Sequence, residues 1–252
     1  MNFFFNTPAS PFAGVPMPPT VQRLNDVATA LEAALCQHFD AEVITKEDSA
    51  LHLTIAEAFD AAQGARDKAA ELASFISFDV PALGLPTGAE YLSRYGTTIG
   101  ETVALPRSWR SLDHAPTRLV VLPHEVGHVD QHKRGVDAGW WPRKVSHSAL
   151  YLCSVATDDA AEYLGHVEAD QYATSEAVSR WLGGAPRPLA ETVDELRRHY
   201  ALRPAGAVVA ESTLKSHYAT MEDGGMPNVR SARFTLDWLE ANAADLKGAV
   251  LS

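Results

Sequence analysis

The sequence predicts an α+β protein that is predominantly helical, and three observations support this prediction. Apolar residues recur at helical spacing along most of the 252 residues. A β-branched run, Thr97–Leu105, interrupts the helical pattern and is closed by Pro106. The sequence His-Glu-Val-Gly-His follows at 124–128, and it predicts a metal-binding helix. We therefore expect a short strand or sheet, then an active-site helix, then a long helix that carries a further metal ligand.

The composition is that of one folded domain without a basic surface. Apolar residues make up 46% of the chain, which is enough for a core, and we expect a single domain over residues 20–252. Lys and Arg number 21 against 32 Asp and Glu, so the net charge is -11 and nucleic acid is excluded as a partner. We expect no signal peptide and no membrane span, because the N-terminus lacks a basic leader and no stretch reaches ~18 apolar residues. Cys36 and Cys153 are expected to be reduced thiols.

The first third of the chain predicts an arm followed by scaffold elements. Residues 1–19 contain five Pro and four Phe, which favours an extended arm that packs on this protein or on a neighbouring subunit. Helical spacing follows over residues 20–39, and Glu42–Thr45 is a candidate short strand. The Ala-rich stretch Ala50–Phe75 predicts two helices that meet near Gly64.

The segments on either side of the metal-binding sequence predict a frame for the site. A short helix is expected at 89–96. The run Thr97–Leu105 is either an exposed edge strand, which could hold an extended peptide by main-chain hydrogen bonds, or an ordinary core hairpin. Residues 137–157 predict a cover over one side of the site. Further helical patterns lie at 157–182, 189–203, 207–220 and 231–247.

The metal-binding sequence places two imidazoles on one helix face. Residues four apart lie one turn apart, so His124 and His128 can reach the same ion. Glu125 lies one step round the helix, where it can hold a metal-bound water rather than the metal. A buried helix whose two His merely find hydrogen-bond partners is the metal-free alternative.

Pro123 allows two starting points for this helix. In one, the helix begins near Arg118 and Pro123 kinks it just before the first ligand. In the other, which we favour, the helix begins at about Leu122 and Pro123 lies in its first turn, where a missing amide costs little. Gly135 is expected to end the helix.

A catalytic zinc site also needs a third protein ligand and one open position. Glu168 lies 40 residues after His128, midway along the long helix predicted at 157–182. Gly165, one turn earlier, is expected to let this helix approach the His pair closely. The rival candidates for the third ligand are His147 and His166.

These residues resemble the gluzincin class of zinc metallopeptidases, whose third ligand is a Glu on a helix downstream of His-Glu-x-x-His. The resemblance covers about residues 90–182 and implies a zincin-like core there. The familiar pattern has an Asp four residues after the ligand Glu, whereas this chain has Tyr172 there and Asp170 two residues after. The stretches that look like uncharacterised metallopeptidase-like proteins of bacterial viruses are Tyr95-Gly-Thr-Thr-Ile-Gly, Val103-Ala-Leu-Pro and Glu168-Ala-Asp-Gln-Tyr-Ala.

The resemblance leads to a hypothesis of zinc-dependent peptide hydrolysis. His124, His128 and Glu168 would hold Zn²⁺, and Glu125 would be the general base for a metal-activated water. The alternative is a phage structural or assembly protein that keeps the zincin fold without turnover and contacts particle neighbours through its arm. We expect the protein in the cytoplasm or in a virion. The residues that could support the ligands or the transition state are Tyr151, Tyr163, Tyr172, His147 and Asp170.

Overall fold

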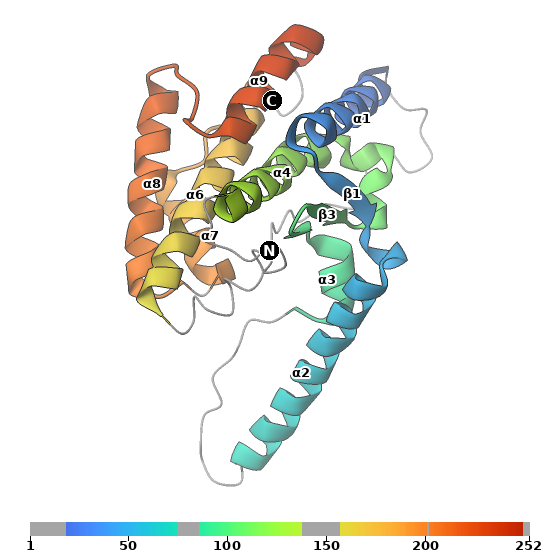
Figure 1. Cartoon of the computed structure of the whole chain (residues 1–252), viewed down its shortest axis with the longest axis vertical. Coiled ribbons are helices and arrows are strands. Elements are labelled where there is room, and N and C mark those ends of the chain that lie inside the picture. Colours follow the sequence, from blue (N-terminus) through green and yellow to red (C-terminus); the bar gives the residue numbers. More distant parts are fainter. Residues whose placement is uncertain (1–18, 75–85, 138–156, 201, 249–252) are drawn as a thin grey trace.

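The computed structural model describes residues 19–74, 86–137, 157–200 and 202–248 (Figure 1). α-Helices account for most of these residues and a three-stranded sheet is set among them, so the predicted helical α+β class is confirmed. None of the described helices combines the length and the apolar character that a membrane crossing requires. The predicted arm up to residue 18 and the predicted cover at 138–156 lie outside the described residues.

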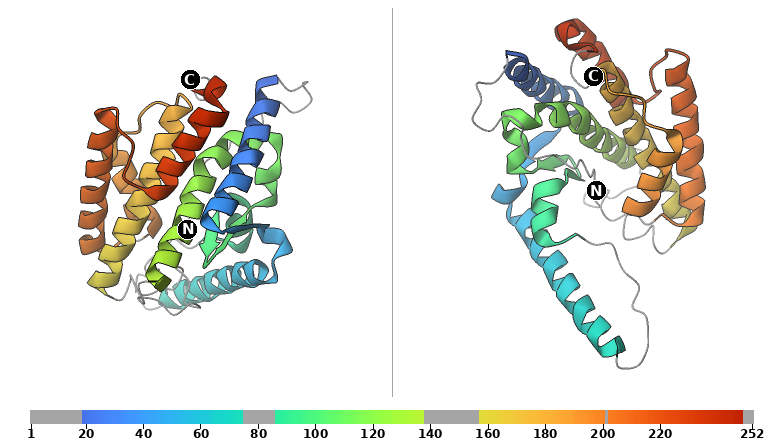
Figure 2. Two further views of the ribbon diagram at one scale, coloured as in Figure 1. Left: turned by 45° about the horizontal axis from the view of Figure 1, so that its top comes forward. Right: turned by 180° about the vertical axis from the view of Figure 1, so that it is seen from behind.

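The core is built around helix α4, Ala115–Asp137, which other elements enclose (Figures 1 and 2). Helices α1, Pro19–Phe39, α6, Asp158–Trp181, and α9, Arg230–Asn242, all pack against it. α4 is buried along most of its length, and its buried residues include charged and polar ones besides the apolar ones. Its fully buried apolar side chains include Leu119, Val121, Val126 and Val129.

The small sheet lies beside α4 and consists of β1, Glu42–Thr45, β2, Thr97–Ile99, and β3, Thr102–Leu105. The strand order is β1-β3-β2, with β1 parallel to β3 and β2 antiparallel to it. The run Thr97–Leu105 is therefore a hairpin, and Gly100 turns it with a positive φ of 62°. Strand β2 is at the same time an edge of the described sheet.

Helix α2, Ala50–Ser74, is one continuous helix, so the predicted break near Gly64 is wrong. Gly64 lies inside this helix, where a glycine lowers helix stability but does not end the helix. A Cβ at Gly64 would meet nothing within 4 Å, so no close packing requires a glycine there. Helix α3, Gly88–Arg94, starts with a capping box between Thr87 and Glu90. Near its N-terminus α2 packs against α3, and its other end extends away from the body (Figure 1).

Helices α7, Leu189–Tyr200, and α8, Pro204–Glu222, complete the helical layer beyond α6. A Cβ on Gly165 would collide with the backbone of Gly206 in α8. Gly165 therefore allows α6 to pack closely against α8. The expectation that it allows close packing against the His-bearing helix is wrong. Three helical residues turn through about 300°, so a residue three before Glu168 lies about 60° away from it around α6 and meets a different neighbour.

Candidate metal centre

Helix α4 begins at Ala115 and passes through Pro123. The favoured start near Leu122 is wrong, and so is the expected end at Gly135, because the helix continues to Asp137. Pro123 offers no amide hydrogen to the carbonyl one turn earlier, which costs a helix about 3 kcal/mol. The burial of apolar side chains along α4 offsets this cost. His124, the first ligand candidate, thus directly follows a residue that donates no backbone hydrogen bond within the helix.

Three side chains from α4 and α6 bring their donor atoms together: His124, His128 and Glu168. The two Nε2 atoms are 3.2 Å apart, and Glu168 Oε2 lies 3.5 Å from His128 Nε2 and 3.9 Å from His124 Nε2. A tetrahedral ion with ligands at about 2.0–2.1 Å separates its donor atoms by about 3.4 Å. The spacing of these three atoms therefore fits one small metal ion. Among the described residues no other group of three has this property.

The electrostatics of the two imidazoles differ because of their neighbours. Burial lowers the pKa of His124 well below its usual value, and His128 lowers it further. Burial acts on His128 in the same direction, but the interactions with Glu168 and Glu125 together outweigh it and raise the pKa of His128. The buried Glu168 carboxylate thus favours positive charge at this point, and a divalent cation can supply that charge.

Glu125 is fully buried and faces the edge strand β2. The Thr98 hydroxyl lies 2.7 Å from Glu125 Oε2 and 3.0 Å from the Glu125 backbone carbonyl. The other carboxylate oxygen, Oε1, has no hydrogen-bond partner in the described part of the chain. Gly96 provides the space, because a Cβ there would lie 2.7 Å from Oε1. One oxygen is thus held and the other is available, which suits a general base.

The close contact between α4 and α6 is made at Gly127. A Cβ on this residue would collide with the side-chain amide of Gln171. Gln171 is itself fixed, because its Oε1 accepts a hydrogen bond of 3.0 Å from the Ser231 hydroxyl of α9. The glycine in the middle of the metal-binding sequence therefore sets the distance between the His pair and the Glu-bearing helix.

Tyr172 occupies the position where the gluzincin pattern has an Asp, and it contacts the first His. Its ring centroid lies 5.7 Å from that of His124, at an interplanar angle of 67°. Burial, with Glu195 and Glu168 nearby, raises the pKa of Tyr172 well above its usual value. Tyr172 therefore stays neutral and supports His124 by ring packing instead of by a negative charge.

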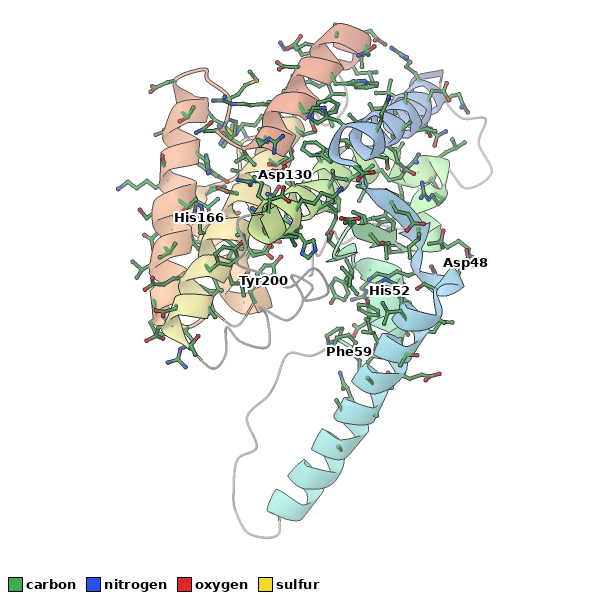
Figure 3. The ribbon with its side chains drawn as sticks, in the orientation of Figure 1. Asp48, His52, Phe59, Asp130, His166 and Tyr200 are labelled. Atoms are coloured by element: carbon green, nitrogen blue, oxygen red, sulfur yellow. The ribbon has the colours of Figure 1, made fainter. Side chains whose placement is uncertain are left out.

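A second buried polar cluster joins the turn that follows β1, the start of α2, where Figure 3 labels His52, and α3. Lys46 is fully buried, and its Nζ lies 3.0 Å from the backbone oxygen of Tyr91 and 3.7 Å from the centroid of the Tyr91 ring. The Tyr91 hydroxyl is 2.6 Å from Nδ1 of His52. Burial lowers the pKa of Lys46 to about 7, although Glu125 and Glu47 act in the opposite direction. The cluster therefore holds a buried amine whose charge is coupled to that of Glu125.

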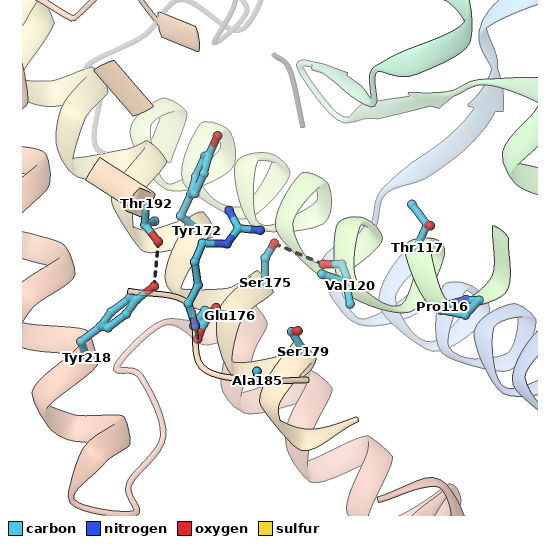
Figure 4. A pocket seen from close by; sticks show the side chains of 11 residues that line it. Pro116, Thr117, Val120, Tyr172, Ser175, Glu176, Ser179, Ala185, Thr192 and Tyr218 are labelled. Carbon is cyan, nitrogen blue, oxygen red and sulfur yellow. Dashed lines mark hydrogen bonds between the residues drawn. The ribbon is translucent and has the colours of Figure 1, made fainter. Parts of the chain in front are cut away.

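A cavity of about 190 Å³ lies beside Tyr172, between α4, α6 and the segment after α6 (Figure 4). Val120, one turn before the first His, lines it together with Ser175 and Glu176 of α6. On the far wall Thr192 Oγ1 lies 2.9 Å from the hydroxyl of Tyr218. A pocket lined by both polar and apolar groups therefore begins one helical turn from the donor cluster.

The other candidate residues lie elsewhere. Asp170 faces α8, where its Oδ1 is 2.9 Å from Nε2 of His217. The side chain of His166 is 55% exposed on the same side, so this rival for the third ligand does not join the cluster. Tyr163 is half-buried and packs against the hydrophobic core. His147 and Tyr151 lie outside the described residues.

Several residues of the site were not among the sequence candidates. Thr98 and Gly96 contact Glu125 across the strand–helix junction, and nothing in their local sequence indicates this contact. Gly127 carried a signal, since a glycine inside a buried helix calls for a packing reason. The remaining additions, which depend on the packing of distant segments, are Lys46, Tyr91, Gln131, Gln171 and Ser231.

The fold and the site together describe a predominantly helical α+β protein with a buried His-His-Glu cluster. No protein-family model, no curated protein and no solved structure matches the chain.

Proposed function

We propose that the chain is a zinc-dependent peptidase with a zincin-like core of the gluzincin type. The observation that carries the proposal is the convergence of His124, His128 and Glu168 at the spacing of zinc ligands, with Glu125 beside them. Two imidazoles and a carboxylate are the ligand set of known catalytic zinc sites. Zinc bound there supplies a Lewis acid that acidifies water and polarises a carbonyl group.

In this proposal Glu125 takes a proton from the attacking water and passes it to the leaving amine. The bond from Thr98 to Oε2 holds the carboxylate, and the unbonded Oε1 is the atom that accepts the proton. The buried surroundings of Glu125 exclude competing water and strengthen each electrostatic interaction. Tyr172 packs against the His124 ring in an edge contact and helps to keep it in place.

The surroundings of the site also support a peptide substrate. Strand β2 is an edge of the described sheet, and its Thr98 hydroxyl lies beside the Glu125 carboxylate. A sheet edge is the element on which proteins commonly bind an extended peptide. The cavity beside Tyr172 offers room for one substrate side chain.

The test combines zinc content with turnover. We expect about one zinc per parent chain, its loss in His128→Ala and Glu168→Ala, and its retention in Glu125→Gln. A mixture of unstructured peptides read by mass spectrometry measures cleavage, and Glu125→Gln should slow it about 10²–10⁴-fold. The matched control is Glu162→Gln, an exposed carboxylate on α6, which should change neither property. Unaltered cleavage by Glu125→Gln would show that this residue is not the base.

One observation favours a second candidate function. His124, His128 and Glu168 are only 0–1% exposed, as in metal sites that stabilise a fold. A structural or assembly protein, such as one of a phage particle, could keep this centre without turnover. Zinc at one per chain together with no cleavage of any peptide in the mixture would favour this candidate.

A further inference from the structure

Gln131 connects the two helices of the candidate metal centre. It lies one turn after His128 on α4 and is buried, with 5% of its surface exposed. Its Oε1 is 2.9 Å from Nδ1 of His128, and its Nε2 is 3.2 Å from the backbone oxygen of Val167 on α6. Val167 directly precedes Glu168. One side chain therefore contacts a ligand candidate on α4 and the backbone next to a ligand candidate on α6.

The contact with Val167 fixes which way the Gln131 amide points. A backbone oxygen can only accept a hydrogen bond, so the NH₂ group of Gln131 has to face Val167. Its Oε1 then faces His128 and can only accept. Nδ1 of His128 must therefore carry the proton, which leaves the lone pair on Nε2.

The orientation of the Gln131 amide disfavours the other neutral form of His128, in which the proton is on Nε2. Glu168 Oε2 lies 3.5 Å from Nε2 of His128, and a carboxylate attracts an imidazole proton more strongly than an amide oxygen does. Without Gln131, a neutral His128 would place its proton on Nε2, toward Glu168. That tautomer has no lone pair for a metal ion at the point where the three donors meet.

We infer that Gln131 is a positioning residue of the metal centre, which keeps Nε2 of His128 available for the ion and ties this ring to the backbone beside Glu168. The inference rests on the proposed metal site. Most ligand histidines are held by a carboxylate, a carbonyl or water. A neutral amide fixes the ring without adding negative charge, so it leaves the bound ion more electrophilic than a carboxylate partner would.

The test compares Gln131→Met with Thr174→Val. Both remove a buried polar group, but the hydrogen-bond partners of Thr174 on α6 are the backbone oxygen of Asp170 and the hydroxyl of Ser231. Competition with a coloured chelator measures zinc affinity. Long-range ¹H–¹⁵N NMR of the metal-free protein, recorded at a pH above the His128 transition that the same spectra show, reports which nitrogen of the neutral ring carries the proton. Thermal unfolding of the metal-free protein measures the cost in stability.

We expect Gln131→Met to bind zinc about 10–100-fold more weakly and to move the His128 proton to Nε2. Thr174→Val should lower the melting temperature while zinc affinity and tautomer stay those of the parent. Gln131→Glu, which still accepts from Nδ1, should keep the parent tautomer. An Nε2-protonated His128 in the parent, or a Gln131→Met variant that matches Thr174→Val in affinity and tautomer, would overturn the inference. If the parent binds no zinc, the proposed function fails, and the metal-free tautomer still decides the role of Gln131.

Discussion

The Glu125 carboxylate fits beside β2 only because residue 96 has no side chain. A Cβ at Gly96 would lie 2.7 Å from Oε1 and 3.1 Å from Cγ and Cδ, so Gly96→Ala has to displace the carboxylate. We expect turnover to fall about 10–100-fold, since a shift of about 1 Å in a catalytic group can cost 10²-fold. Zinc content should stay that of the parent, because the atoms nearest to the added Cβ all belong to Glu125 and not to a donor residue.

The control for this substitution is Gly64→Ala. An added Cβ at Gly64 meets nothing within 4 Å, and alanine favours a helix over glycine by about 1 kcal/mol. The control should therefore be slightly more stable than the parent and equally active. Kinetic constants normalised to zinc content make the comparison, and full activity in Gly96→Ala would contradict the assigned position of Glu125.

Lys46 should make the stability of the protein depend on pH. Its pKa is about 7 in the folded chain, against 10.5 for the free side chain, so between these values only the unfolded chain binds the proton. The free energy of unfolding then rises with pH by up to about 1.4 kcal/mol per unit, and below pH 7 the contribution is constant. Urea unfolding from about pH 7 to 9.5 should show a rise of about 3 kcal/mol that Lys46→Met lacks. Equal pH dependence in both proteins would contradict the burial of a neutral amine.

The sequence allowed the prediction of those site residues whose relation is set within one helix. His124, Glu125 and His128 follow from helical spacing alone, and Glu168 follows from the need for a third ligand on a later helix. Gly96 and Gln131 could not be predicted, because their partners depend on how a strand and a second helix dock on α4. Such contacts leave no periodic signal in a single sequence.

At the scale of the elements, two glycines on neighbouring helices should have separate effects. Gly127→Ala pushes α4 away from Gln171 on α6, whereas Gly165→Ala pushes α6 away from α8. Overpacking of this kind costs typically about 1–3 kcal/mol, so urea unfolding should show a loss of stability in both variants. Zinc titration should show weaker binding only in Gly127→Ala, since this substitution alone changes the distance between the ligand-bearing helices. Equal zinc affinity in the two variants would contradict the role of Gly127.

Element boundaries show where local rules gave way to packing. The strand Glu42–Thr45 and the capped helix at 88–94 were predicted nearly as observed, because their signals are local. Pro123 and Gly64 were interpreted as interruptions and neither ends its helix. The helix around Pro123 is buried on every face, and this packing stabilises the helix through the proline. Gly64 lies in an Ala-rich segment whose other residues favour the helix strongly enough to continue through it.

At the scale of the whole molecule, zinc should raise the resistance of the protein to heat. An ion that binds only the folded chain stabilises it by about 2.7 kcal/mol at a free concentration of 100 times Kd. For a domain of this size that corresponds to about 5–10 °C in Tm. Calorimetry with zinc and after chelation measures the shift, and His128→Ala should show none. A parent protein with the same Tm with and without zinc would contradict a metal site that exists only in the folded chain.

Helix α9 holds the site together from the far end of the chain. Arg230 contacts Asp130 on α4 at 2.5 Å, and the adjacent Ser231 bonds Gln171 on α6, so one turn of α9 fastens both ligand-bearing helices. Residue 242, at the end of α9, leaves the ribosome about 5–20 s after residue 137 at the end of α4, at 5–20 residues per second. During translation the three donor side chains are therefore made before the helix that fixes their spacing. A nascent chain that lacks α9 carries His124, His128 and Glu168 without the contacts that hold α4 and α6 together.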